Sequence, residues 1–190
     1  MTPRYGVSLA LVHHPIRDRA GNVITTSVTN LDVHDLARAA RTYGLRRYYV
    51  VTPIEAQRAL VRHILGYWRE GSGARRVPER GEALSIVREV ASLDDAIGDI
   101  TREEGAAPTM YTTAAKADRA PTRYAEAAER LRARETPGLL VFGTGYGLAP
   151  EVIARADVHL AAVRPGGYNH LAVRSAVSII LDRLFGDEGA

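Results

Sequence analysis

Short apolar runs rich in β-branched and aromatic residues alternate along the chain with longer, alanine-rich amphipathic stretches. The short runs have the length of buried strands, and the longer stretches have the periodicity of helices that pack one face on a core. This alternation predicts an α/β fold in which a mostly parallel sheet carries helices on both faces. Six strands are predicted, at residues 5–12, 46–52, 85–90, 109–114, 138–143 and 158–163.

Helices are predicted between these strands. Leu31 and Leu36 have helical spacing, and Gly44 is a suitable C-terminal stop. The predicted helices cover residues 31–44, 53–68, 93–104, 121–134, 149–156 and a final stretch ending near residue 185. Loops are predicted at 13–30, with a small hairpin near 22–28, and at 71–81, the most loop-like stretch. Because no repeat or linker interrupts the pattern, we expect one domain over residues 1–190.

The composition excludes several kinds of chemistry. The chain of 190 residues contains no cysteine, which excludes disulfides, thiolate metal sites and cysteine nucleophiles. No apolar run approaches the roughly 18 residues of a membrane helix, and no signal peptide opens the chain, so we expect a cytoplasmic protein without membrane contact. Histidines and carboxylates lack metal-ligand spacing, and no metal is expected.

Positive charge is concentrated in the first part of the chain. Residues 1–80 carry 13 arginines against 6 acidic residues, whereas residues 81–190 carry 12 basic residues against 16 acidic ones. An arginine-rich half beside an acidic half predicts a face that binds a polyanion. The alternative is that these arginines are solvated surface charges.

The segment VFGTGYGLAP, at residues 141–150, changes abruptly from an apolar run to glycines spaced by single residues. Glycine in this pattern suits a loop whose backbone turns sharply or approaches a ligand. The spacing of Gly143, Gly145 and Gly147 is not the GxGxxG of dinucleotide sites and follows a late strand, which disfavours a simple dinucleotide-binding domain. Loops 114–120 and 164–170 also follow late strands, so we expect all of these loops at one edge of the sheet.

Three segments together resemble the SPOUT class of RNA methyltransferases, whose C-terminal part forms a deep trefoil knot. VFGTGYGLAPEVIARAD (141–157) is similar to the run VFG-x-E-G-x-G-L-(S/A)-P-E of the ribose 2′-O branch, and residues 160–184 are similar to the strand, loop and long helix that follow it. Residues 32–44 share the frame N-x-G-A-x-x-R-T-A-x-x-F-G, which places Arg38 on the functional arginine of the class. The resemblance implies an α/β-knot fold, S-adenosylmethionine as cofactor, and tRNA or rRNA as substrate.

The sequence departs from the 2′-O branch at two places. Gly145 replaces the glutamate that follows VFG-x, and the loop is one residue shorter. The asparagine of the N-terminal motif falls on Asp32, with Asn30 two residues away. Methylation of a base and methylation of a ribose therefore both stay open, as does the identity of the general base.

The resemblance implies roles for particular residues. Arg38, Asp32 and Asn30 are the predicted catalytic residues, and Arg38 would contact an RNA phosphate or favour a deprotonated nucleophile. Main-chain groups of the knot loops are expected to hold the cofactor, with its adenine between Leu148 and Leu171. The predicted cofactor site comprises Thr113, Ala114, Phe142, Gly143, Thr144, Gly145, Gly147, Leu148, Val163, Arg164, Pro165, Gly167, Tyr168, Asn169, His170 and Leu171.

Arg17, Arg19 and Arg41, in the basic half, are predicted to bind RNA phosphates. The class pairs its terminal helix with that of a second copy, which implies a homodimer, although core packing explains the apolar spacing of that helix equally well. Two other functions stay open: a non-catalytic nucleotide- or RNA-binding module on a Rossmann-like sheet, and a small-molecule methyltransferase. His13, after the first predicted strand, is either a buried structural histidine or a proton acceptor.

Overall fold

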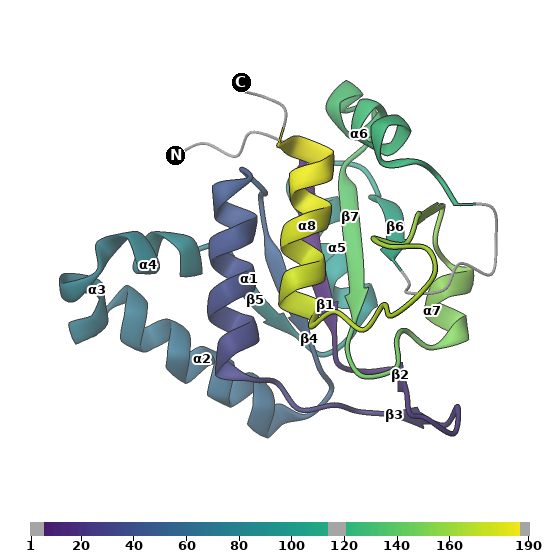
Figure 1. Cartoon of the computed structure of the whole chain (residues 1–190). Coiled ribbons are helices and arrows are strands. Elements are labelled where there is room, and N and C mark those ends of the chain that lie inside the picture. Colours follow the sequence, from purple (N-terminus) through teal and green to yellow (C-terminus); the bar gives the residue numbers. More distant parts are fainter. Residues whose placement is uncertain (1–5, 114–120, 187–190) are drawn as a thin grey trace.

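A six-stranded parallel sheet forms the centre of the molecule (Figure 1). The computed structural model describes residues 6–113 and 121–186. The strand order is β5-β4-β1-β7-β6-β8, and each neighbouring pair is parallel, which confirms the predicted α/β fold. The strands are β1 (Val7–Val12), β4 (Tyr48–Val51), β5 (Val87–Val90), β6 (Thr109–Thr113), β7 (Gly138–Gly143) and β8 (Val158–Leu160).

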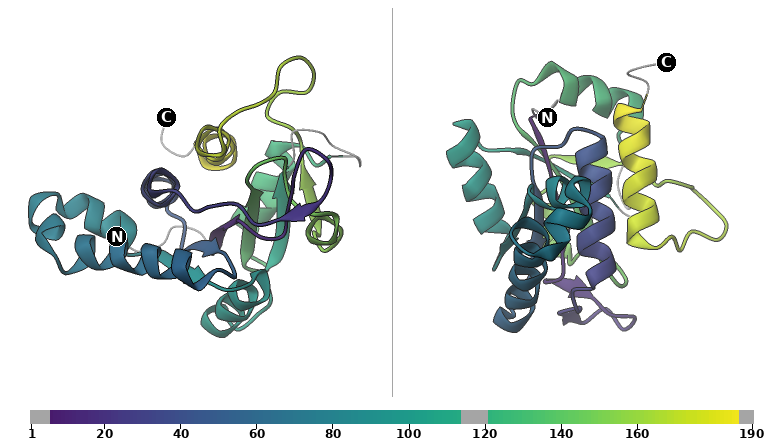
Figure 2. Two further views of the ribbon diagram at one scale, coloured as in Figure 1. Left: turned by 90° about the horizontal axis from the view of Figure 1, so that it is seen from below. Right: turned by 90° about the vertical axis from the view of Figure 1, so that its left-hand side faces the viewer.

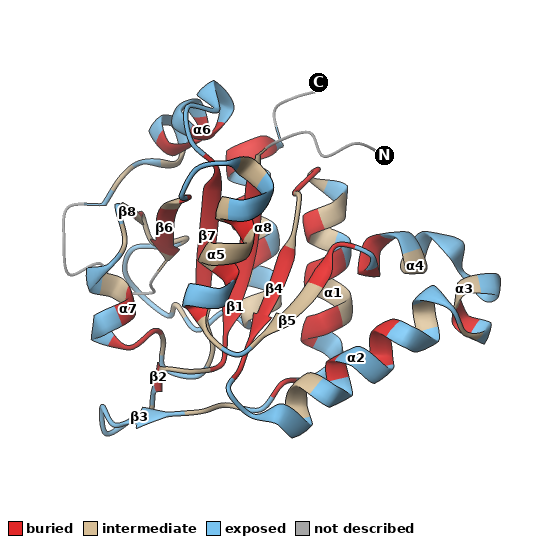
Figure 3. Ribbon diagram, turned by 180° about the vertical axis from the view of Figure 1, so that it is seen from behind, coloured by how far each residue is buried: buried red, intermediate tan, exposed pale blue. Residues whose placement is uncertain are grey.

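Helices cover both faces of this sheet, as predicted (Figures 1 and 3). Leu9 and Leu11 of β1 belong to one buried cluster, whereas Ala10 and Val12 belong to the other. Because both faces of the central strands are covered, their sequences are continuously apolar instead of alternating. The first cluster includes α1 (Asn30–Thr42), α2 (Glu55–Arg69), α4 (Pro78–Leu84), α6 (Tyr124–Ala133) and α8 (Val173–Phe185), and the second includes α5 (Leu93–Glu104) and α7 (Pro150–Ala154).

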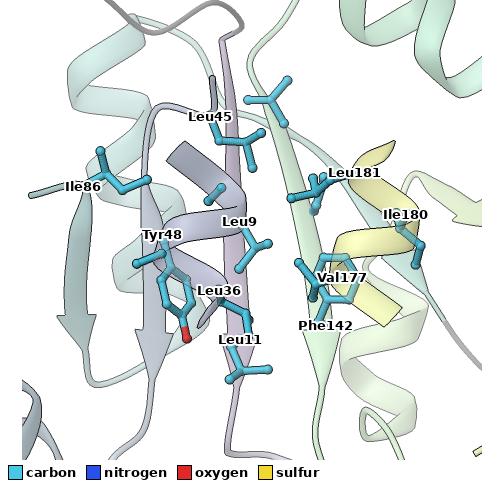
Figure 4. Close-up of a cluster of buried hydrophobic side chains, with 14 of the residues drawn as sticks. Leu9, Leu11, Leu36, Leu45, Tyr48, Ile86, Phe142, Val177, Ile180 and Leu181 are labelled. Carbon is cyan, nitrogen blue, oxygen red and sulfur yellow. The ribbon is translucent and has the colours of Figure 1, made fainter. Parts of the chain in front are cut away.

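The larger cluster joins α1 and α8 to the middle of the sheet. Figure 4 shows side chains of α1 (Leu36), β1 (Leu11), β7 (Phe142) and α8 (Val177) gathered in it. The apolar stripe of α8 is buried within the chain, so core packing accounts for it. Truncating a fully buried leucine such as Leu11 to alanine would cost about 2–5 kcal/mol.

All six strands end at one edge of the sheet, because every pair is parallel. The register sets Val12 at the end of β1 beside Gly143 at the end of β7. The segment after β1 forms a small antiparallel hairpin from β2 (Ile16–Arg17) and β3 (Val23–Ile24). The loops after β1, β7 and β8 are thereby brought to this carboxyl edge, where the sequence predicts the site.

The prediction of a loop at residues 71–81 is wrong. This segment forms α3 (Ser72–Arg76) and the beginning of α4, whose first residue is Pro78. Proline is favoured at the first helical position because it has no N–H to leave unpaired, and buried Leu84 anchors the helix. Strand β8 is also shorter than predicted and ends at Leu160.

No helix among residues 6–113 and 121–186 is long and apolar enough to cross a membrane. Within the same residues, no group of three or more histidines and carboxylates is placed to hold a metal ion. The chain between β6 and α6 includes residues 114–120, which lie outside the described part of the structure. The trefoil knot therefore stays a prediction. The single domain over residues 1–190 also stays a prediction. Just beyond that segment, the amide of Thr122 donates to the carbonyl oxygen of His159 beside β8 (2.7 Å).

Candidate active site at the carboxyl edge

The glycine loop after β7 (residues 143–149) is fastened to the segment that follows β1. The amide of Arg17 donates a hydrogen bond to the carbonyl oxygen of Gly147 (3.0 Å). Ile16 and Leu148 form a β-bridge, and both side chains are buried in the core. Packing against the rest of the chain therefore fixes the shape of this loop.

The glycines of this loop are needed for two different reasons. A side chain at Gly143 would place its Cβ 2.8 Å from the backbone nitrogen of Leu148, so the close approach of the chain requires glycine. Gly145 and Gly147 have φ angles of +58° and +109°, a region that favours glycine. The amide of Gly147 donates to the carbonyl oxygen of Thr144 (3.0 Å), which closes a tight turn.

A short chain of hydrogen bonds lies beneath this turn. The hydroxyl oxygens of Thr144 and Thr26 are 2.5 Å apart, and the Thr26 hydroxyl is 3.1 Å from Nδ1 of His13. His13 is fully buried, and its Nε2 has no hydrogen-bond partner among the described residues. Burial lowers the pKa of His13 to about 4, and the negative charge of Asp32 opposes this shift. Because such a low pKa makes a weak proton acceptor at neutral pH, the structural role of His13 is favoured.

A partly buried ion pair links α1 to the beginning of α8. The side chain of Thr29, the N-cap of α1, donates to Oδ2 of Asp32 (2.6 Å) and accepts from the Asp32 amide. Arg174 lies 3.3 Å from Asp32 and 3.3 Å from Asp35. Asp32 is buried, whereas the Arg174 side chain is 34% exposed and can reach a ligand at this edge. Sequence reasoning missed Arg174, although two carboxylates three residues apart on one helix favour a cation between them.

The loop between β8 and α8 is largely exposed at this edge. It projects from the body of the molecule in both views of Figure 2. Side chains of α6 and α8 bind the backbone of its first residues. The hydroxyl of Tyr124 donates a hydrogen bond to the carbonyl oxygen of Ala161 (2.6 Å), and Arg183 donates one to the carbonyl oxygen of Val163 (2.9 Å). Farther on, Tyr168 is 84% exposed.

The predicted cofactor residues lie in the turn after β7, in the core, at the end of β6 and in the β8–α8 loop. Gly143, Thr144, Gly145 and Gly147 form the anchored turn, while Phe142 and Leu148 are buried in the core. Thr113 ends β6 at the same edge of the sheet. Ala114 lies outside the described residues. The half-buried Val163 and Asn169 and the exposed Arg164, Pro165, Gly167, Tyr168, His170 and Leu171 belong to the β8–α8 loop.

The predicted catalytic residues do not all come together. Asp32 faces Arg174, and Asn30 is the first residue of α1. Arg38 is exposed farther along α1 and lines a groove on the side of α2. The structure therefore brings Asp32, but not Arg38, to Arg174.

Of the predicted RNA-binding arginines, Arg17 and Arg19 are exposed on the β2–β3 hairpin beside the glycine loop. Arg41 is different, because it forms an ion pair with Glu82 (2.7 Å) and its side chain is 15% exposed. Other arginines of the basic half are also paired, as Arg47 is with Glu103 (2.7 Å). Internal ion pairs therefore neutralise part of the positive charge counted in the sequence.

Residues 6–186 match the model of a family described as SAM-dependent RNA methyltransferases, and the chain belongs to that family. S-adenosylmethionine is the cofactor by which the family is defined. The class predicted from the glycine loop and its flanking motifs is thus confirmed.

Several relatives share at least 40% sequence identity with this chain. Over 186 residues the chain is 44% identical to a protein of Oleidesulfovibrio alaskensis named tRNA (guanine-N(1)-)-methyltransferase, covering 97% of this chain and 43% of that one. It is 40% identical to an uncharacterized protein of Aquifex aeolicus, covering 94% of this chain and 88% of that one. The chain thus spans less than half the length of the named relative, whereas the Aquifex protein is close to it in length.

Solved structures share the fold at low identity. The A. aeolicus TrmH/SpoU tRNA modifying enzyme aligns with a TM-score of 0.59 at 14% identity, covering 97% of this chain and 76% of that one. An AdoMet-bound rRNA methyltransferase from Sinorhizobium meliloti aligns with a TM-score of 0.58 at 15% identity, covering 100% of this chain and 60% of that one. These likenesses support the arrangement of the sheet and its helices.

The residues at the carboxyl edge fit S-adenosylmethionine. Gly166 and Gly167 have positive φ, and a Cβ at either of them would meet no atom within 4 Å, so their backbone faces open space, whereas the N–H and C=O groups of Gly147 are already bonded to Thr144 and Arg17. Exposed main-chain N–H and C=O groups can bind an adenine edge and ribose hydroxyls without obstruction by side chains. Leu171 is exposed and available to an adenine face, whereas the Leu148 side chain packs in the core.

Proposed function

We propose that this chain transfers the methyl group of S-adenosylmethionine to RNA, and that the RNA is a tRNA. The family match over residues 6–186 carries this proposal. The anchored and the open glycine loops at one edge support it, because together they offer a fixed turn and an accessible backbone. The relatives named as tRNA methyltransferases support the choice of RNA. Their names describe chains more than twice as long, so the acceptor atom is the quantity that the experiment below must identify.

In this proposal the cofactor supplies an electrophilic methyl group, and the protein supplies position. The turn at residues 143–149 and the backbone at Gly166 and Gly167 hold the cofactor. Arg174, fixed between two carboxylates, contacts the RNA group beside the acceptor atom, and a bidentate guanidinium suits a phosphate oxygen there. Asp32 acts through Arg174 and is a positioning residue.

Other features complete the proposal. Leu31, Tyr146 and Tyr168 are large side chains that are 57%, 64% and 84% exposed near this edge. A second copy that covers them would form a homodimer through this edge and not through the apolar stripe of α8, which is buried within the chain. We also propose one domain over residues 1–190 and a cytoplasmic location, where tRNA is found.

The test is to incubate the purified chain with S-adenosylmethionine carrying an isotopic methyl label and with unmodified tRNA or rRNA. Digestion to nucleosides and mass spectrometry would then identify the labelled nucleoside. Label on ribose identifies 2′-O transfer, and label on a base identifies the base. Gly143→Val is the matched inactive control, because its side chain cannot fit beside the Leu148 nitrogen.

Labelled tRNA, absent with Gly143→Val, is the expected result. Binding of S-adenosylmethionine without labelled RNA in either class would favour the non-catalytic module. Label in a small metabolite and not in RNA would favour the small-molecule enzyme. Calorimetry with S-adenosylmethionine and with NAD separates a failed cofactor site from a wrong substrate, since the proposal expects binding of the first alone.

A further inference from the structure

The helices α2, α3 and α4 form a lobe beside α1, away from the glycine loops (Figures 1 and 2). A groove of about 520 Å³ lies between this lobe and α1. Its lining includes Trp68 and Tyr67 of α2, His34 and Arg38 of α1, and Arg80 of α4. None of these side chains takes part in the site described above, except for the role that the sequence predicts for Arg38.

Aromatic rings form one wall of this groove. Tyr67 and Trp68 meet edge to face, with ring centroids 5.2 Å apart and an interplanar angle of 88°. His34 meets the Trp68 ring in the same way, at 5.5 Å and 82°. Tyr67 is 43% exposed. A cluster of this kind offers a platform on which a flat, unstacked base can pack.

Two arginines, Arg38 and Arg80, place positive charge beside these aromatic rings. The guanidinium of Arg80 lies 4.8 Å from the centre of the Trp68 ring. Neither Arg38 nor Arg80 has an ion-pair partner within the described ranges, and the nearby carboxylate of Asp35 faces Arg174 instead. The Nε of Arg80 and the Nδ1 of His34 also have no hydrogen-bond partner among the described residues. Reorienting these groups toward a ligand would break no hydrogen bond at these two atoms.

From this chemistry we infer that the groove binds one unstacked nucleotide of the RNA substrate, with its base against Tyr67 and Trp68 and its phosphate at Arg38 and Arg80. The inference rests on the proposed function, because it assigns the same RNA to a second contact. Aromatic rings beside unpaired guanidinium groups match a nucleotide, which combines a flat base with a phosphate.

The position of the groove agrees with this role. Its lower end is formed by Asn30 and Leu31, the first residues of α1. Asp32 follows directly on α1, and its partner Arg174 lies at the beginning of α8. An RNA strand held in the groove would therefore continue toward the carboxyl edge, and the groove would help to select which nucleotide reaches the methyl donor.

Trp68 is the only tryptophan of the chain, so its fluorescence reports on the groove. A short oligouridylate is the probe, and S-adenosylmethionine alone is the control titrant. Stacking of uracil on the indole is expected to quench the emission in a saturable way, and added salt should reverse the quenching because phosphate binding releases counterions. S-adenosylmethionine should leave the emission unchanged.

Variants make the test specific. Arg80→Gln should weaken oligouridylate binding about tenfold, the size of a lost charge-assisted contact. The matched control is Arg102→Gln on α5, on the other face of the sheet, which should bind like the unmodified chain. Trp68→Phe retains a ring and should bind within a few-fold, whereas Trp68→Ala should lose about tenfold or more, measured by anisotropy of labelled RNA. Thermal unfolding checks that Trp68→Ala, which removes packing against the core, remains folded.

Each outcome decides one proposal separately. If tRNA is methylated but Trp68 emission does not change at saturating RNA, or if Arg80→Gln binds normally, the groove is wrong and the proposed function stands. If the groove binds RNA but no methyl group is transferred, the groove stands and the proposed function fails. If Trp68 emission changes with protein concentration alone, and sedimentation shows a dimer, a second copy covers the groove and the inference is overturned.

Discussion

The two glycine-containing loops at the carboxyl edge are built in opposite ways. The β7–α7 loop is bonded to Arg17 and anchored by buried Leu148, and glycine is needed at 143 because the chain passes too close for a side chain. The β8–α8 loop is exposed, and Gly166 and Gly167 face open space. The same residue type therefore fixes shape in one loop and gives access to the backbone in the other.

The largest expected effect comes from a side chain in the anchored loop. Gly143→Val would place Cβ 2.8 Å from the Leu148 nitrogen, so the loop must move away from the core. We expect a loss of about 3 kcal/mol in the free energy of unfolding, in the range of overpacked cores, together with loss of cofactor binding. Denaturant unfolding and calorimetry with S-adenosylmethionine measure the two effects.

Gly166→Ala is the matched change in the open loop. It meets no atom within 4 Å, and only its φ of +88° is unfavourable, so stability should fall by about 1 kcal/mol while cofactor affinity falls clearly. Equal losses of stability in the two variants would break the distinction between an anchored and an open loop.

The next effect concerns Arg174, where the open loop meets α8. Arg174→Gln removes the charge between Asp32 and Asp35 and is expected to lower methyl transfer about a hundredfold, as for other lost stabilising donors. Cofactor affinity should stay within a few-fold, because this residue is assigned to the RNA. Steady-state kinetics with tRNA measures the methyl transfer, and calorimetry with S-adenosylmethionine measures the cofactor affinity. A parallel loss of cofactor binding would assign Arg174 to the wrong ligand.

Much of the fold could be predicted from the sequence, because continuous apolar strands and amphipathic helices leave few other arrangements. The segment 71–81 could not, since Pro78 signals a loop and a first helical position equally. The site residues stay predictions, and the structure brings only some of them together. Residues 32 and 38 are six apart on a helix of about 3.6 residues per turn, so they point to different sides, and this geometry separates Asp32 from Arg38. Burial of His13 and the pairing of Arg41 with Glu82 depend on tertiary contacts, which no local pattern contains.

His13 gives a pH test of the anchored loop. Its pKa is lowered by burial from 6.5 to about 4, so between these values the unfolded chain binds more protons than the folded one. Stability must therefore fall as the pH decreases, by about 2 kcal/mol from pH 7 to pH 5. His13→Asn retains a group near Nδ1 for Thr26 and should lose this part of the pH dependence. Denaturant unfolding of both proteins at the two pH values gives the difference, and identical pH profiles would contradict the assignment.

The smallest expected effect concerns the charges around the two loops. If Arg17, on the hairpin that fastens the anchored loop, binds an RNA phosphate, Arg17→Gln should lower RNA affinity and flatten its salt dependence by roughly 0.7 log units per log unit of salt, the value for one single-stranded phosphate. Arg41→Gln and Arg130→Gln should leave the slope unchanged, because these arginines are paired with Glu82 (2.7 Å) and Glu126 (2.6 Å). Anisotropy of labelled tRNA at several salt concentrations measures all three. A flatter slope for Arg130→Gln than for Arg17→Gln would place the RNA on α6, away from both loops.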